Sequence, residues 1–272
     1  MAYSKTNKAK IQYYLDNPEF VKHEYLELNK TTAQLSEEWG LPKSTVYNIT
    51  KKLGLVGIKL AEKVTYCNED KFNINDEIFC YLAGLTSADG YIDEKNHRVT
   101  LRMSIEAKEI LERLHDYFEV SNLVAPYSGD GGYTQGYTMY DLTISSRKLL
   151  DELRKLNIYG RKKDLLVRFP DMSKFNDVQQ EMYMRGLWDG DGTIRYHSYT
   201  SIFQESELFI QAIAEYLVDK HNAKLKVNPR IKDNIEIGYD LFTDTPSALR
   251  FYSWLYRHNL TFKIEKKYNR QF

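Results

Sequence analysis

The chain has 272 residues, of which 42% are hydrophobic and 28% are charged, and these ordinary globular values exclude a disordered or fibrous protein. The 38 Lys and Arg residues balance the 38 Asp and Glu residues, so the formal net charge of zero argues against a polycation that coats DNA or an anionic membrane. No run approaches the roughly 18 apolar residues of a membrane span, and the first residues lack the apolar core of a signal peptide. Cys67 and Cys80 give neither a disulfide framework nor paired zinc-ligand spacing, so we expect an intracellular protein with no membrane partner.

The first zone, residues 1–60, is polar, helical in character and poor in strand-forming residues. Thr31 and Gln34 have the spacing of a capping box at the start of a short helix, and residues 40–42 form a turn that ends it. We expect Ser44 to cap a second helix whose apolar residues face inward.

This arrangement resembles a helix-turn-helix whose recognition helix lies near residues 44–53. Such a domain would add contacts to a DNA target or tether the protein to the DNA. The structural alternative is an ordinary three-helix packing unit. The polar residues expected on the outer face of the second helix are candidate DNA contacts, and they are Lys43, Thr45, Tyr47, Asn48 and Lys51.

After a linker at 61–72, one order of patterns occurs twice, over residues 73–168 and again over residues 169–272. Each copy mixes stretches of helical apolar spacing with stretches of strand-like alternation, in the order α-β-β-α-β-β-α. A repeat of about 100 residues is too long for a solenoid unit and indicates two copies of one compact domain. The predicted fold class is therefore α+β, with two pseudo-symmetric repeats that follow a small all-α domain.

The first helix of each copy ends in a similar sequence, LAGLTSADG at 82–90 and MRGLWDGDG at 184–192. Small residues four positions apart lie on one face of a helix and let two backbones approach closely. A glycine then ends each helix, as at many C-caps. The residues expected in the contact between the two helices are Gly84, Ala88, Gly186 and Gly190.

An aspartate precedes the final glycine of each motif, Asp89 in the first copy and Asp191 in the second. If the helices pack face to face, these carboxylates meet at the negative ends of both helix dipoles, where divalent cations would relieve their repulsion. Two acids with hard cations suit in-line attack on a phosphodiester. An Asp-Gly helix stop without further role is common, but its occurrence in two copies favours the catalytic interpretation.

Both segments resemble the LAGLIDADG motif of homing endonucleases, and the repeat order resembles the single-chain, two-repeat members of that family. The resemblance implies a saddle of two antiparallel sheets over the major groove of double-stranded DNA, and we expect a monomer. It also implies metal-dependent double-strand breaks across the minor groove at a long target site, with short 3′ overhangs. The family's metal-binding acid corresponds to Asp89 and Asp191, with Mg²⁺, Mn²⁺ or Ca²⁺ as the cation. At the sixth motif position Ser87 departs from the consensus, whereas the second copy has Asp189.

The family also places a basic residue near the active site after the last helix of each repeat. In this chain Lys163, with Lys162 one position away, and Lys267 match that segment best. A lysine there would stabilise phosphate charge or polarise the attacking water, whereas a solvated basic tail is the alternative. Gln204 resembles a water-positioning catalytic glutamine, with its counterpart in the first copy expected near residues 105–106.

Alternation along the strands identifies polar faces that would meet DNA. In the second copy Leu225, Val227 and Ile231 are expected on the covered face of the sheet. Long donors on a two-stranded ribbon fit the major groove, where they read base edges or bind phosphates, and the alternative is the solvated face of a half-covered sheet. The candidate DNA contacts are Arg98, Thr100, Arg102, Ser104, Lys224, Lys226, Asn228 and Arg230.

The favoured function is a site-specific homing endonuclease, a phosphodiester hydrolase that acts in intron homing. The alternative is a non-cleaving binding protein on the same scaffold, either a maturase that assists intron RNA or a DNA-binding regulator. Retention of both aspartates favours the enzyme, because a pure binder could replace either one. The neutral chain is also unevenly charged, since residues 154–170 hold six basic residues against one acidic residue.

Overall fold

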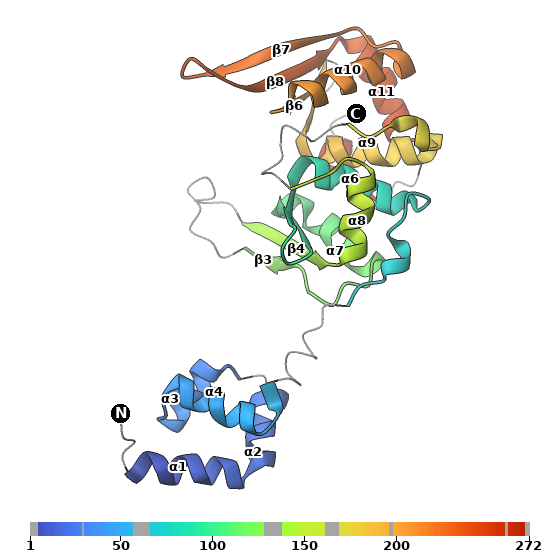
Figure 1. Ribbon diagram of the computed structural model, residues 1–272. Helices are drawn as coiled ribbons and strands as arrows, with labels where there is room; N and C mark the ends of the chain where they lie inside the picture. Colours follow the sequence, from blue (N-terminus) through green and yellow to red (C-terminus); the bar gives the residue numbers. More distant parts are fainter. Residues whose placement is uncertain are drawn as a thin grey trace. The chain divides into compact units, whose positions relative to one another are not determined.

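The computed structural model describes residues 5–28, 30–56, 66–127, 138–160, 169–195, 198–258 and 261–269. The chain divides into two compact units, Met1–Val64 and Thr65–Phe272 (Figure 1). Within the described ranges, none of the helices combines the length and hydropathy that crossing a bilayer requires.

The described part of the N-terminal unit is mainly helical. Its elements are α1 (Lys5–Asp16), α2 (Pro18–Lys22), the π-helix η1 (His23–Glu27), α3 (Thr32–Trp39) and α4 (Lys43–Lys52). The expected capping box begins α3, because the Gln34 amide donates to Thr31 Oγ1 at 3.2 Å and the Thr31 amide donates to Gln34 Oε1 at 2.8 Å. The helices share a small core that includes Val21, Leu35 and Val46.

Helix α4 differs from the sequence prediction at two residues. It begins at Lys43 and has no side-chain cap, so Ser44 does not cap it. Thr45 is only 4% exposed because it lies on the covered face of the helix beside Val46, and its expected outward position is wrong. The other candidate contacts of this helix are exposed, and they are Lys43, Tyr47, Asn48 and Lys51.

The second unit repeats one order of elements, and the predicted α-β-β-α-β-β-α order is confirmed in both copies. The first repeat contains α6 (Glu77–Asp89), β1 (Gly90–Asp93), β2 (Arg98–Ser104), α7 (Lys108–Tyr117), β3 (Ala125–Pro126), β4 (Met139–Ser145) and α8 (Arg147–Lys155). The second contains α9 (Asp177–Asp191), β5 (Gly192–Ile194), β6 (Thr200–Gln204), α10 (Glu207–His221), β7 (Leu225–Lys232), β8 (Ile235–Thr243) and α11 (Thr245–Leu255). Short helical turns accompany them at η2 (Glu69–Lys71), η3 (Ile105–Ala107), η5 (Met172–Lys174) and α12 (Glu265–Tyr268). Each repeat forms an antiparallel sheet, in the order β1-β2-β4-β3 or β5-β6-β8-β7.

Each repeat's first helix begins at a side-chain cap. The Asp76 carboxylate accepts hydrogen bonds from the amides of Ile78 and Phe79, both at 2.9 Å. Asn176 and Gln179 form a reciprocal capping box at the start of α9. These local signals fix where both helices start, and therefore where the motif sequences fall along them.

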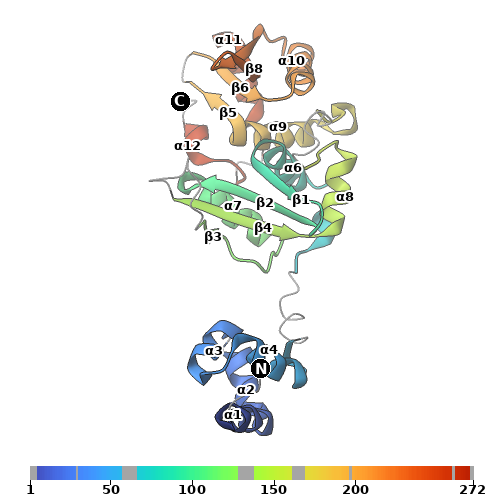
Figure 2. The same cartoon turned by 60° about the vertical axis from the view of Figure 1, so that its left-hand side comes forward.

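Helices α6 and α9 pack against each other in the middle of the unit (Figures 1 and 2). A Cβ atom added at Gly84 would lie 2.0 Å from the carbonyl oxygen of Tyr183, and one at Gly186 would lie 2.1 Å from that of Tyr81. No side chain fits at either position, so the small residues of the two motifs permit this close approach.

The glycines that end the two motif helices serve a different purpose from the one expected. Gly90 and Gly192 have φ of −75° and −72°, so neither adopts the left-handed conformation of many C-caps. A Cβ at Gly90 would lie 2.4 Å from the Thr86 carbonyl oxygen, and one at Gly192 would lie 2.3 Å from Trp188 Cδ1. Steric room for an immediate turn into β1 or β5 therefore requires glycine at these two positions.

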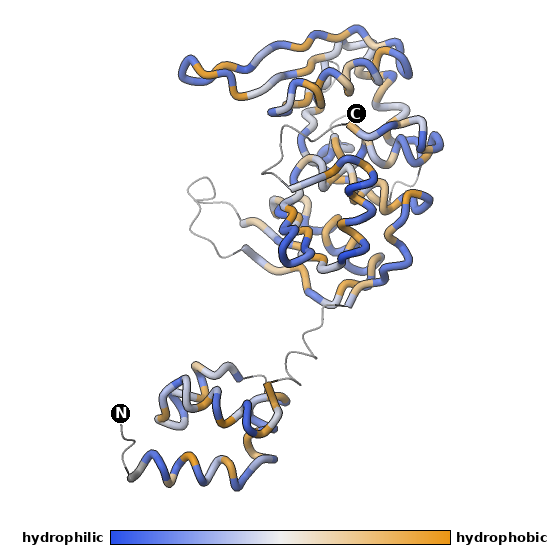
Figure 3. The backbone as a smooth tube through the Cα atoms, viewed as in Figure 1, coloured by the Kyte–Doolittle hydropathy of each residue, from blue (hydrophilic) through white to orange (hydrophobic). Residues whose placement is uncertain are grey.

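One face of each sheet is covered by helices and the other carries polar side chains. Figure 2 shows β1, β2 and β4 side by side with α7 behind them. Burial alternates along β2 in the predicted register, and Figure 3 shows hydrophilic and hydrophobic segments alternating along the β7–β8 hairpin. Ile231 is 64% exposed, which contradicts its expected covered position, because a β-bulge between Arg230 and Ile231 shifts the register of the hairpin end.

Residues 66–72, at the end of the expected linker, contact the first repeat. The Tyr66 amide donates to Ser121 Oγ at 2.8 Å, and the Asn68 amide donates to the Phe118 carbonyl at 2.8 Å. Phe72 is fully buried in the core of the second unit.

Candidate nuclease site and nucleic-acid interface

The aspartates of the two motifs lie where α6 and α9 end. Asp89 is the last residue of α6, and Asp191 is the last residue of α9. The helix ends approach so closely that a Cβ at Gly190 would lie 2.2 Å from the Cβ of Ala88 and 3.4 Å from Oδ2 of Asp89. The structure thus brings the two motif carboxylates to one place.

Both aspartates line a cleft of about 190 Å³, which we call the Gln204 cleft. One wall comes from the end of β6 and the other from the segment after α8. Gln204 Nε2 donates to Asp191 Oδ2 at 2.7 Å, so the amide holds one oxygen of this carboxylate. The polar residues that line the cleft include Asp89, Asp191, Gln204, Glu205 and Tyr159.

A second cleft, of about 320 Å³, also includes Asp89, and we call it the Lys267 cleft. One wall comes from the end of β2 and the other from the segment after α11. Each cleft therefore joins a strand end of one repeat to the segment that follows the last helix of the other repeat. The polar residues that line the Lys267 cleft include Asp89, Ser104, Glu106, Lys266 and Lys267.

Lys267 binds the carbonyl end of α9. Its Nζ donates to the carbonyl oxygens of Trp188 at 3.0 Å, Gly190 at 2.7 Å and Gly192 at 2.8 Å. The ammonium group thereby offsets the negative end of the helix dipole next to Asp191. The corresponding predictions for the first repeat, Lys163 and the neighbouring Lys162, lie outside the described residues.

The counterpart of Gln204 in the first repeat was expected near residues 105–106, and this prediction is wrong. Gln204 pairs with Tyr239 across β6 and β8, and Met103 pairs with Tyr140 across β2 and β4. Strand register, rather than the distance along the chain from the motif, decides which side chain faces the helix ends. The first sheet therefore presents a buried methionine where the second presents an amide.

The sixth motif positions meet tyrosines of the opposite helix. Asp189 is buried and accepts hydrogen bonds from Tyr81 Oη at 2.8 Å, Tyr256 Oη at 2.9 Å and the Ile264 amide at 3.0 Å. Ser87 Oγ lies 3.0 Å from Tyr183 Oη in the matching position. Burial raises the pKa of the Asp189 carboxyl, while the charge of Lys267 and the three donors act in the opposite direction.

These tyrosine contacts with the sixth motif positions were missed by sequence analysis. Tyr81 and Tyr183 precede the sixth motif position by the same number of residues in both copies, which is a signal that the sequence contains. Contact between them and the opposite helix follows from the packing of α6 on α9, so neither copy alone reveals their partners.

The donors at the helix ends fit a hard divalent cation. Asp89 and Asp191 offer carboxylate oxygens in a cleft open to solvent. Among the described residues, no group of three or more His, Cys, Asp or Glu side chains could hold a metal ion. Two carboxylates suit Mg²⁺, which usually keeps several waters and takes one or two carboxylates together with substrate phosphate oxygens.

The polar face of β2 has one arginine held in a fixed orientation. Arg102 Nε and Nη2 donate to the two carboxylate oxygens of Asp141, both at 2.8 Å, and the guanidinium lies 3.3 Å from the centre of the Tyr127 ring. Thr100 Oγ1 lies 3.0 Å from Thr143 Oγ1 on the neighbouring strand. The other candidates of this strand are Arg98, which is exposed, and Ser104, which is half-buried.

The second sheet repeats this arrangement on the β7–β8 hairpin. Arg230 binds both carboxylate oxygens of Asp240, with Nε donating to Oδ2 at 2.7 Å, and lies over the Phe203 ring at 4.1 Å. Both carboxylates, Asp141 and Asp240, were missed by sequence analysis, because only strand pairing places them opposite an arginine. The other candidates, Lys224, Lys226 and Asn228, are exposed.

Comparison with known proteins agrees with this fold. Residues 76–157 match the sequence model of a LAGLIDADG-like domain. No curated protein sequence matches the chain significantly. The homing endonuclease I-WcaI, solved bound to its DNA recognition sequence, is similar in structure, with 12% identity, a TM-score of 0.53, and coverage of 71% of this chain and 84% of that chain.

Two further solved structures are similar at lower TM-scores. Mesophilic variants of the homing endonuclease I-DmoI are 17% identical, with a TM-score of 0.46 and coverage of 67% of this chain and 97% of theirs. Full-length DUF199/WhiA from Thermatoga maritima is 16% identical, with a TM-score of 0.47 and coverage of 75% of this chain and 66% of that chain.

The second unit is thus a pair of motif helices flanked by two antiparallel sheets, which is the fold of the LAGLIDADG homing endonucleases. The chain contains a LAGLIDADG-like domain.

Proposed function

We propose that this protein is a site-specific DNA endonuclease of the homing type, which cuts both strands of a long target in a metal-dependent reaction. The observation that carries the proposal is the meeting of Asp89 and Asp191 at the packed ends of α6 and α9, with a cleft on each side. A helix stop without further function would explain one Asp-Gly pair, but not two carboxylates placed together at the negative ends of two helices.

Asp89 and Asp191 would bind Mg²⁺ or a similar divalent cation. When bound, the cation would supply charge stabilisation to the attacking and leaving oxygens of the phosphodiester. Gln204 holds Asp191 and would orient the water that attacks in the Gln204 cleft. Lys267 would place a positive charge beside the phosphate in the Lys267 cleft, and we propose the same role for Lys163.

The exposed sheet faces would bind the target in its major groove, and cleavage across the adjacent minor groove would leave short 3′ overhangs. The arginines at Arg102 and Arg230 are oriented by carboxylates, an arrangement suited to recognising a guanine edge. Arg98, Lys224 and Lys226 are exposed cations that suit phosphate contacts. Thr100, Ser104 and Asn228 offer shorter donors on the same faces.

The N-terminal unit would add target contacts through the outer face of α4. Lys43, Tyr47, Asn48 and Lys51 are exposed on this helix, while Thr45 belongs to its covered side. We propose that this unit acts as a helix-turn-helix that increases affinity for DNA next to the cleavage site.

The proposal is tested by target capture followed by cleavage. DNA fragments that the full-length protein retains from a random library in Ca²⁺ are sequenced, placed in a plasmid and incubated with the protein in Mg²⁺. We expect linear product only from plasmids that carry the captured site. Capture of a defined sequence with no strand cleavage in Mg²⁺ or Mn²⁺ would contradict the nuclease and support the non-cleaving binding protein.

A further inference from the structure

A stripe of buried polar side chains runs along α9. Glu181, Arg185 and Asp189 are spaced four residues apart, so they share one face of the helix. They are 0%, 0% and 1% exposed. The residues 102 positions earlier in α6 are Phe79, Ala83 and Ser87, so the first repeat has no such stripe.

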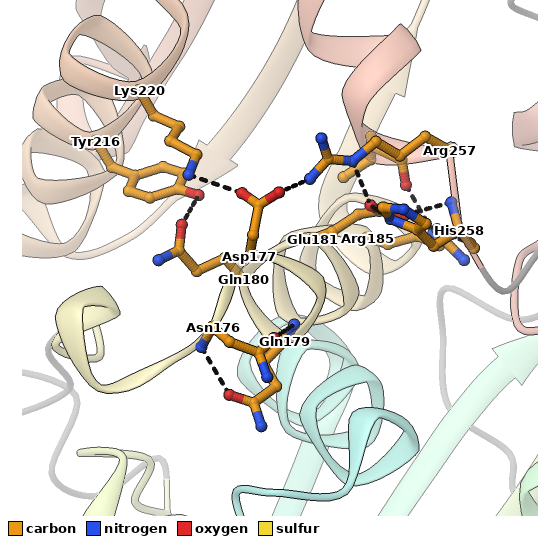
Figure 4. A network of polar contacts seen from close by, with 11 residues as sticks. Asn176, Asp177, Gln179, Gln180, Glu181, Arg185, Tyr216, Lys220, Arg257 and His258 are labelled. Atoms are coloured by element: carbon orange, nitrogen blue, oxygen red, sulfur yellow. Dashed lines mark hydrogen bonds and ion pairs between the residues drawn. The ribbon is translucent and has the colours of Figure 1, made fainter.

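The first two residues of the stripe bind the end of α11 and the chain that follows it. Glu181 Oε1 accepts from the His258 amide at 2.9 Å, and its Oε2 lies 2.7 Å from His258 Nδ1 and accepts from Arg257 Nε at 3.0 Å (Figure 4). Arg185 donates to three carbonyl oxygens of the same region, those of Leu255 at 2.8 Å, His258 at 2.5 Å and Phe262 at 3.2 Å.

The third residue binds the chain further on. Asp189 accepts from Tyr256 Oη and from the Ile264 amide, and it also accepts from Tyr81 Oη of α6. Helix α12 begins directly after Ile264, and the Lys267 amide donates to the Ile264 carbonyl at 2.9 Å. The fixed Ile264 backbone therefore determines where the Lys267 side chain starts.

Stability alone does not explain the stripe. A buried ion pair such as Glu181–Arg185 is often no more stabilising than apolar residues of similar size, and α6 packs with Phe79 and Ala83 at the two equivalent positions. The polar groups instead fix the backbone at Leu255, His258, Phe262 and Ile264 by hydrogen bonds, whereas apolar packing would define these positions less sharply.

We propose that Arg185 and Asp189 are positioning residues. They hold the backbone at His258, Phe262 and Ile264 on α9, so that Lys267 stays in the Lys267 cleft beside Asp89. The inference rests on the proposed nuclease function for its consequence, namely that cleavage of one strand depends on this stripe. The positioning itself is a property of the protein without DNA.

The first test measures the accessibility of Lys267 in the full-length protein without DNA. Acetylation of Lys267 by an N-hydroxysuccinimide ester is measured by mass spectrometry. The value is normalised to the acetylation of the exposed Lys226. Asp189→Ser, which introduces the residue of the first repeat, and the milder Tyr256→Phe should raise labelling of Lys267 by about tenfold and about threefold. Tyr216→Phe is the matched control, because it removes a tyrosine hydroxyl that donates to Gln180 Oε1 of the same helix at 3.0 Å, and should change nothing.

The second test follows the two DNA strands separately on a labelled target. Lys267→Met and Tyr256→Phe should slow cleavage of the same strand, the lysine variant by about tenfold or more, and Gln204→Leu should slow the other strand. A general loss of stability would slow both strands alike. Circular dichroism checks that each variant is folded, and Tyr256→Phe decides the result if Asp189→Ser is not.

The two tests separate the positioning from the proposed function. Unchanged Lys267 labelling in folded Tyr256→Phe, or equal slowing of both strands by that variant, would overturn the positioning. A wild-type protein that cuts no DNA would refute the nuclease, while increased Lys267 labelling in the variants would still establish that the stripe holds the lysine.

Discussion

At the scale of single residues, the surroundings of the two motif aspartates differ. Asp191 accepts a hydrogen bond from Gln204, whereas the first sheet has Met103 at the same register position. Asp89 lines both clefts and shares one of them with Lys267. The proposed centres therefore use different groups beside similar carboxylates, so substitutions in one cleft should affect the two DNA strands unequally.

His221 provides a residue-scale prediction of pH dependence. It lies among aromatic rings, and burial, followed by the charges of Lys220 and Arg250, lowers its pKa from 6.5 to about 4. Between these two values the unfolded chain binds a proton that the folded protein does not. The stabilising effect of the neutral ring is thus fully present above pH 6.5 and is lost as the pH falls towards 4.

Replacing His221 by phenylalanine removes this pH-dependent contribution to the free energy of unfolding. Wild type should lose about 2 kcal/mol more unfolding free energy than His221→Phe between pH 7 and pH 4.5. Urea unfolding at both pH values measures the difference. Equal losses in the two proteins would show that His221 is protonated without cost in the folded state.

At the scale of elements, the close packing of α6 on α9 determines where the aspartates meet. The packing depends on the absence of side chains at Gly84 and Gly186, since a Cβ at either would collide with backbone of the other helix. Backbone atoms cannot rotate away as a flexible side chain can, so an added methyl group must separate the helices.

Gly84→Ala should therefore destabilise the second unit by about 3 kcal/mol and lower any cleavage activity. Gly54→Ala is the control, because nothing lies within 4 Å of its added Cβ and only its φ of 72° adds strain, which costs about 1 kcal/mol. Chemical denaturation measures both values. A loss of unfolding free energy no larger in Gly84→Ala than in Gly54→Ala would contradict the close packing of α6 on α9.

Arg102 and Lys226, on the exposed faces of the two sheets, should contribute differently to DNA binding. Arg102→Ala should weaken discrimination at one base pair of the target by about 2 kcal/mol, because Asp141 and Tyr127 orient the guanidinium for base recognition. Lys226→Ala should instead weaken binding to all DNA sequences. It should also lower, by about 1, the magnitude of the slope of log binding constant against log salt concentration. Binding-site selection at several salt concentrations measures both effects. The assignment fails if Arg102→Ala weakens binding evenly across sequences.

At the scale of the whole molecule, the order of elements in both repeats could be predicted from the sequence. Helix caps such as Asp76 and Asn176, strand alternation and the duplicated motif are local signals, and they survive in the folded chain. The surroundings of the site could not be predicted in the same way. The contact of Lys267 with the end of α9 joins residues 75 to 79 positions apart, and the counterpart of Gln204 depends on strand register.

We propose that Asp89 and Asp191 together form the cleaving centre of a DNA endonuclease. Strand cleavage and DNA binding by Asp89→Asn and Asp191→Asn test it most directly, with the exposed Asp219→Asn on α10 as the matched control. We expect that neither motif variant makes double-strand breaks in Mg²⁺, that both still bind the target, and that Asp219→Asn cuts like wild type. Double-strand cleavage by both motif variants at the wild-type rate would contradict it.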